Sequence, residues 1–134
     1  MDEHAQRHLR VGWWSLALFA SLGLLIEALH AFKAPFLVDA GSEITRMLLR
    51  LGHAHGTLLA LVNLIFAVMP APRPHLASRA LLLAQVLVPG GFLLGAIGAR
   101  GGDPGAGVVL VPLGALALIA AAVLAARHVQ SPAE

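Results

Sequence analysis

The sequence contains no cysteine and no tyrosine, and only 12% of its 134 residues are charged. The absence of cysteine excludes disulfides, thiolate metal sites and cysteine nucleophiles. The absence of tyrosine removes one of the two usual aromatic anchors at a membrane interface. Soluble domains carry about 25% charged residues, whereas this chain is 58% hydrophobic. A chain of this length cannot bury so much apolar surface in its own core, so we expect lipid to surround much of it.

The charge balance excludes a second class of function. Nine Lys and Arg residues against seven Asp and Glu residues give a net charge of +2. A nucleic-acid-binding protein concentrates many basic residues on one face, and this small, scattered surplus does not. We therefore expect no nucleic-acid partner.

Four stretches contain no formally charged side chain at all: residues 11–26, 51–72, 80–99 and 104–126. Each is close to the ~20 residues that a helix needs to cross a bilayer. None alternates with a period of two, as the strands of a membrane barrel would. The sequence therefore predicts a single all-α domain over residues 1–134, an integral membrane four-helix bundle with helices at about 11–32, 43–69, 77–99 and 106–126.

The distribution of basic residues bears on orientation. Four spans place both termini and the link near residue 75 on one side, which then holds five of the nine basic residues. Cytoplasmic segments tend to be the more basic ones. We therefore expect a multi-pass protein of a prokaryotic-type inner (plasma) membrane with cytoplasmic termini. Such a small bundle has little interior volume, which favours a homo-oligomer or a place in a larger membrane complex.

Ionisable residues inside the first two spans mark the candidate site. Ionisable groups at membrane depth are costly and usually functional. Glu27 shares a face of the first span with Ala20 and Gly23, and His53 shares a face of the second with Gly56. Small residues let membrane helices approach closely, so a hairpin would bring Glu27 and His53 to similar depth. We predict an intramembrane Glu27/His53 site, unless the pair serves only to hold the two helices together.

Other polar residues surround this predicted pair. On the same helix faces lie His30, Arg50, Thr57 and Asn63. His55 lies about 200° around the helix from His53, so one regular helix cannot direct both imidazoles to one metal ion. The remaining histidines fall in flanks and links, where we expect solvated surface positions: His4, His8, His75 and His128.

The segment His53-Ala54-His55 resembles the His-x-His helix of haem–copper oxidase subunit I, in which one helix serves two haems. The resemblance covers three to six residues. It implies haem or a transition metal ion as cofactor, with His53, His55 and His30 as candidate ligands. Neutral imidazole is a good ligand for haem iron, copper and zinc.

A second resemblance covers more of the chain. Four spans, the segment His53-Ala54-His55-Gly56 and a glycine-rich link before the last span are similar to small membrane proteins of the hydroxylaminobenzene mutase type. Those proteins rearrange an aryl hydroxylamine to an aminophenol. The family pattern His-Leu-Glu-Gly has a glutamate where this chain has His55. The resemblance implies acid–base catalysis by Glu27 and His53.

Two further interpretations stay open. Leu25-Ile26-Glu27 in a four-span chain is similar to the proton-coupled glutamate segment of small multidrug exporters. A bundle with glycine seams also suits an accessory subunit of a larger membrane complex. Among these interpretations we favour haem or transition-metal binding at the Glu27/His53 site.

Overall fold

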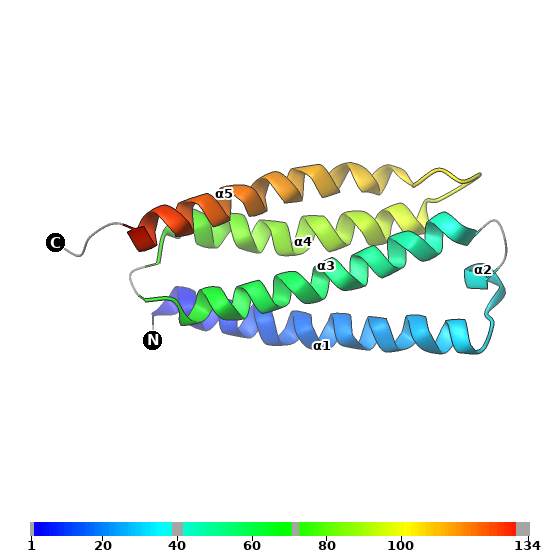
Figure 1. Ribbon diagram of the computed structural model, residues 1–134, viewed down its shortest axis with the longest axis horizontal. Coiled ribbons are helices and arrows are strands. Elements are labelled where there is room, and N and C mark those ends of the chain that lie inside the picture. The colour runs from blue at the N-terminus through cyan, green and yellow to red at the C-terminus, as the bar shows by residue number, and fades with distance from the viewer. Residues whose placement is uncertain (1, 39–41, 71–72, 131–134) are drawn as a thin grey trace.

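The structure is a computed structural model that describes residues 2–38, 42–70 and 73–130. Within these ranges the chain is almost entirely helical (Figure 1). The elements follow in the order α1 (Glu3–Ala31), α2 (Pro35–Val38), α3 (Glu43–Val68), α4 (His75–Ile97), η2 (Ala106–Val109) and α5 (Leu110–Gln130). The predicted all-α bundle is therefore confirmed.

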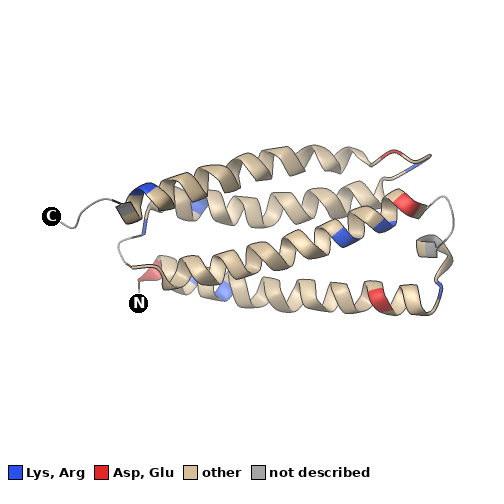
Figure 2. Ribbon diagram, in the orientation of Figure 1, with Lys and Arg blue, Asp and Glu red and all other residues tan. Residues whose placement is uncertain are grey.

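The long helices have the length and composition of membrane spans. In the described ranges there are four helices that are long and apolar enough to cross a bilayer. The shortest, α5 with 21 residues, is about 32 Å long, and the hydrocarbon core is about 30 Å thick. Charged residues gather toward the two ends of the bundle, while its middle is nearly free of them (Figure 2). The chain is a multi-pass membrane protein.

The long helices pack in chain order, each antiparallel to the next. α1 packs on α3, α3 on α4, and α4 on α5, so α1 and α5 are the outer members (Figure 1). In α4, 44% of the most apolar stretch is buried. In the last span, Ala106–Val129, which comprises η2 and most of α5, the corresponding share is 11%. The large side chains left exposed, such as Trp14 and Leu116, are those that a hydrocarbon environment would cover.

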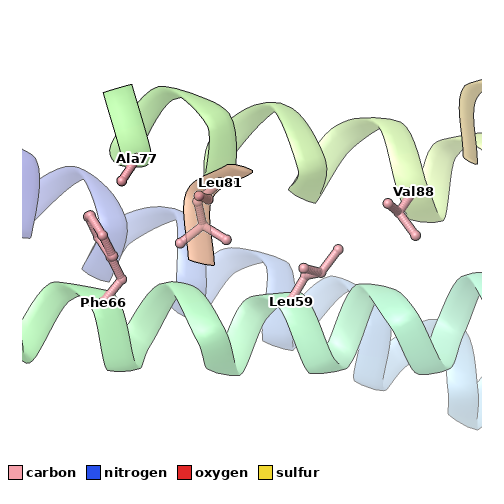
Figure 3. Close-up of a cluster of buried hydrophobic side chains, with 6 residues drawn as sticks. Leu59, Phe66, Ala77, Leu81 and Val88 are labelled. Carbon is pink, nitrogen blue, oxygen red and sulfur yellow. The ribbon is translucent and has the colours of Figure 1, made fainter. Parts of the chain in front are cut away.

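The main apolar core lies between α3, α4 and α5, toward the end of the bundle that holds the start of α1. Its buried members include Phe66 and Leu59 of α3 and Leu81 of α4 (Figure 3). Leu59 and Leu81 are almost completely inaccessible to solvent. This packing holds α3 and α4 together and so fixes the face that α3 turns toward α1.

Small residues bring the helix backbones together, as the sequence predicts. At Gly23 of α1, an added Cβ would collide with the imidazole of His53, and at Gly56 of α3 it would collide with the ring of Phe19. At Gly114 of α5, an added Cβ would lie 2.7 Å from Val88 of α4. The seams of α1 and α3, and of α4 and α5, therefore do pack against each other.

The largest difference from the predicted helix boundaries is at the start of α1. The helix begins at Glu3 rather than near residue 11. The Asp2 carboxylate accepts a hydrogen bond from the Ala5 amide at 2.7 Å, which caps the helix. The added turns bury His8 inside the bundle and bring the partly buried His4 next to Ser78 of α4.

Candidate functional site

A groove between α1 and α3 contains the ionisable residues predicted at membrane depth. Glu27, Arg50 and His53 all line it, and its volume is about 190 Å³. The other lining residues are Ala20, Gly23, Leu24 and Ile26. An acid, a guanidinium and an imidazole thus share one small groove with apolar walls.

His53 is oriented by the backbone of the neighbouring helix. Its Nδ1 lies 2.7 Å from the carbonyl oxygen of Phe19. Because a carbonyl oxygen only accepts, Nδ1 must carry the proton and donate it. In neutral His53, the lone pair is then on Nε2. Gly23 leaves room for the ring on α1, so the helix seam and the hydrogen bond together fix its position.

Glu27 and Arg50 are the exposed ionisable residues of the groove. Both side chains are accessible at its surface, and Glu27 makes no hydrogen bond or ion pair within the described part of the chain. Arg50 also lines an adjoining groove of about 440 Å³, together with Arg46 and Glu43. Arg46 donates to the Leu37 carbonyl at 2.8 Å. Arg46, Arg50 and His53 follow one another at helical spacing along one face of α3.

His55 faces a different neighbour, as its position on the helical wheel predicts. Its ring packs on Phe92 of α4 with a centroid distance of 4.9 Å. Its Nδ1–H donates to the Leu51 carbonyl at 2.9 Å. His53 faces α1 and His55 faces α4, so the two imidazoles do not converge, but both carry their lone pair on Nε2 when neutral.

The other predicted residues lie apart from the groove. His30 is exposed near the end of α1. The hydroxyl of Thr57 is buried without a hydrogen-bond partner among the described residues. Asn63 is completely buried, but it belongs to a second polar cluster farther along α3.

That second cluster centres on His8, and it corrects the expectation of a solvated His8. The side chain is completely buried. Its Nδ1 lies 2.6 Å from Asn63 Oδ1, its Nε2 lies 2.8 Å from Ser78 Oγ, and its ring packs on Phe66. The sequence contained a signal for this position, since His8 precedes Gly12, Phe19 and Gly23 at helical spacing on the face of α1 that packs against α3.

The polar cluster continues at both ends. Asn63 Nδ2 donates to the Leu59 carbonyl at 2.9 Å and to Gln85 Oε1 at 3.0 Å. Gln85 Nε2 in turn lies 3.4 Å from the Gly56 carbonyl. Toward the helix ends, Ser78 Oγ lies 3.4 Å from His4 Nδ1. A hydrogen-bonded chain therefore runs from the surface near His4 into the centre of the bundle.

The described residues contain no chelating metal site, because no three of their His, Asp or Glu side chains converge on one point. The sequence matches no protein-family model, no curated protein and no solved structure.

Proposed function

We propose that this membrane protein binds haem within the bilayer through Nε2 of His53. The observation that supports this is the hydrogen bond from His53 Nδ1–H to the Phe19 carbonyl. Histidines that ligate metals almost always donate their other N–H to such an acceptor, which fixes the tautomer and the ring orientation. In His53 this leaves Nε2, the nitrogen that would ligate iron, unprotonated and without a hydrogen-bond partner among the described residues.

The proposal favours haem over a bare transition metal ion. A bare ion needs three or four protein ligands, and the described residues bring no such set together. Haem iron already has four macrocycle nitrogens, so one or two imidazoles complete its coordination. Arg50 beside His53 also disfavours a free cation by charge repulsion.

The basic residues next to His53 suit the acidic edge of haem. Arg50 and Arg46 lie about one and two turns from His53 along α3, and both line the adjoining groove. Guanidinium groups pair well with carboxylates, so these two residues would bind the propionates. The groove is open, so the rest of the macrocycle would contact lipid, a second copy of the chain or another subunit.

An optical spectrum of the detergent-purified protein, expressed with haem available, tests the proposal. We expect a Soret band that His53→Ala abolishes and that His128→Ala, a matched histidine change near the end of α5, leaves intact. His55→Ala tests the other imidazole with a free Nε2. A wild-type protein without the band after haem reconstitution would rule the proposal out. The mass of the purified particle measures its oligomeric state.

The residues that line the groove also support a second candidate function. This is acid–base catalysis on a small amphipathic molecule that enters from the bilayer. Glu27, Arg50 and His53 line one volume of about 190 Å³ with otherwise apolar walls. Neutral His53 can accept a proton at Nε2, and Glu27 can act as a general acid or base. Arg50 can stabilise negative charge that develops on the substrate. This arrangement would suit the mutase-type rearrangement that the sequence resemblance implies.

Phenylhydroxylamine is the substrate to test for this second candidate. We expect aminophenol formation by the wild-type protein and a loss of at least about a hundredfold in both Glu27→Gln and His53→Ala. Lys33→Gln, at the end of α1 outside the groove, serves as the control. If both variants keep wild-type activity, the groove is not the catalytic site.

A further inference from the structure

The chain His4–Ser78–His8 is the strongest feature that the proposed function leaves unexplained. These residues lie at the end of the bundle that holds the start of α1, whereas Glu27 lies near the other end of that helix. His8 and Ser78 are completely buried. His4 is only partly buried, so the hydrogen-bonded chain reaches the molecular surface there. A buried imidazole linked by a hydroxyl to an accessible one can exchange a proton with it.

The direction of every hydrogen bond in this chain follows from the acceptors. Asn63 uses Nδ2 for Leu59 and Gln85, so its Oδ1 accepts from His8 Nδ1–H. Neutral His8 then has its lone pair on Nε2, and the Ser78 hydroxyl donates to it. The Ser78 oxygen can in turn accept from His4 Nδ1–H, at 3.4 Å.

A proton that enters at His4 reverses this chain without leaving a polar group unpaired. Protonated His4 gives its Nδ1 proton to Ser78 Oγ, and Ser78 passes its own proton to His8 Nε2. His4 is then neutral with its proton on Nε2, and Ser78 donates to His4 Nδ1. His8 is now a cation that donates from Nδ1 to Asn63 and from Nε2 to Ser78. One proton has been added and each bond has a donor and an acceptor in both states.

We propose that His8 is a buried proton-binding site that exchanges with the aqueous phase through Ser78 and His4. This site is separate from the His53 groove and does not depend on the function proposed for it. Because both end states satisfy their hydrogen bonds, protonation needs no unfolding of the bundle.

The groups around His8 determine how readily it takes up a proton. On α1, His4 and Arg7 lie near it, and Arg73 approaches from the segment before α4. α3 contributes only the neutral Asn63 and Phe66, and α4 contributes Ser78, with His75 packed edge-on against His4. The nearby carboxylates of Asp2 and Glu3 are bonded to Arg73 and Arg7. The cation of His8 therefore has neutral hydrogen-bond partners, no carboxylate beside it and two arginines nearby, whose positive charges oppose its formation.

Nitrogen NMR of the full-length protein with ¹⁵N-labelled histidine, in micelles, tests the proposal directly. At neutral pH we expect both His4 and His8 as Nδ1–H tautomers. When the pair takes up its first proton on acidification, His8 should gain its Nε2 proton while His4 stays neutral and changes to the Nε2–H tautomer. A His4 tautomer that does not change as His8 charges would overturn the proposed chain.

Two variants separate proton transfer from fold stability. Ser78→Ala removes only the bridging hydroxyl, and we expect proton exchange at His8 to slow by roughly tenfold or more, because the path loses a hydrogen bond to a charged group. His4→Ala should slow it similarly, and Ser15→Ala on the same helix should not. An exchange rate at His8 that is unchanged in both Ser78→Ala and His4→Ala would refute the proposal.

Discussion

Arg73 Nη1 lies 2.6 Å from Asp2 Oδ2, and this ion pair joins the N-cap residue of α1 to the segment before α4. The same guanidinium donates to the carbonyl oxygens of Phe66, Ala67 and Met69. Those carbonyls belong to the last turn of α3 and its C-cap residue, where no amide four residues farther along the helix is left to donate to them. Arg73 therefore caps one helix while it pairs with the N-cap residue of another.

We expect the Asp2 carboxylate to make stability depend on pH below about 4. The hydrogen bond from the Ala5 amide, together with Arg73, lowers the pKa of Asp2 from its ordinary value of 3.8. Above 3.8 the carboxylate is ionised whether the chain is folded or not, and its contribution is complete. As the pH falls through the lower folded-state pKa, that contribution is lost.

Thermal unfolding in detergent at a series of pH values checks this. Asp2→Asn should lower the Tm at neutral pH and should flatten the loss of Tm between about pH 4 and 2 relative to wild type. Glu3→Gln is the matched control, because Glu3 is 86% exposed in its pair with Arg7 and exposed pairs contribute little. An Asp2→Asn protein with the wild-type pH profile would show that the charge of Asp2 does not contribute to stability, because asparagine still caps the helix.

Replacing Arg73 should cost more than replacing any other basic residue on this side of the bundle. The side chain is only 7% exposed, so Arg73→Met removes the guanidinium from both Asp2 Oδ2 and the carbonyl oxygens at the end of α3. We expect a loss of about 2–3 kcal/mol in the free energy of unfolding, measured by denaturation in mixed micelles. Arg79→Met, at an exposed position of α4, should change it by less than about 0.5 kcal/mol.

The sequence predicted the bundle because four long uncharged stretches admit few other structures in lipid. It also predicted that Gly23 and Gly56 face the neighbouring helix, and that His53 and His55 face different ones. These results depend only on helical periodicity. They needed no knowledge of side-chain partners.

The polar cluster around His8 was not predicted, because its partners are far apart in sequence. His8 bonds to Asn63, 55 residues away, and to Ser78, 70 residues away. Helical periodicity places each residue on a face, but it does not specify which polar groups meet across helices. The polar residues 2–10 also resembled a solvated flank, and only the helix cap at Asp2 shows why the helix includes them.

Gly23 of α1 lies directly against the imidazole of His53, so a larger residue at position 23 should cause a specific defect. An alanine there would displace the His53 ring from the Phe19 carbonyl. We expect Gly23→Ala to destabilise the bundle by about 1–3 kcal/mol and to abolish whichever activity His53 supports. Gly90→Ala is the control, because nothing lies within 4 Å of the added methyl group. Comparable losses in both variants would argue against a tight seam at His53.

The hydrogen bond between Asn63 and Gln85 predicts non-additive mutations. Both side chains are buried, so Asn63→Leu leaves His8 Nδ1–H and Gln85 Oε1 without partners, at a cost of about 1–3 kcal/mol. Once Gln85 is also leucine, part of that cost disappears because one of the two unpaired groups is gone. The double variant should therefore lose less stability than the sum of the single variants, by about 0.5–2 kcal/mol. Gln6→Leu, at an exposed position of α1, should add independently to Asn63→Leu. Strict additivity of Asn63→Leu and Gln85→Leu would mean that the two amides do not interact in the membrane.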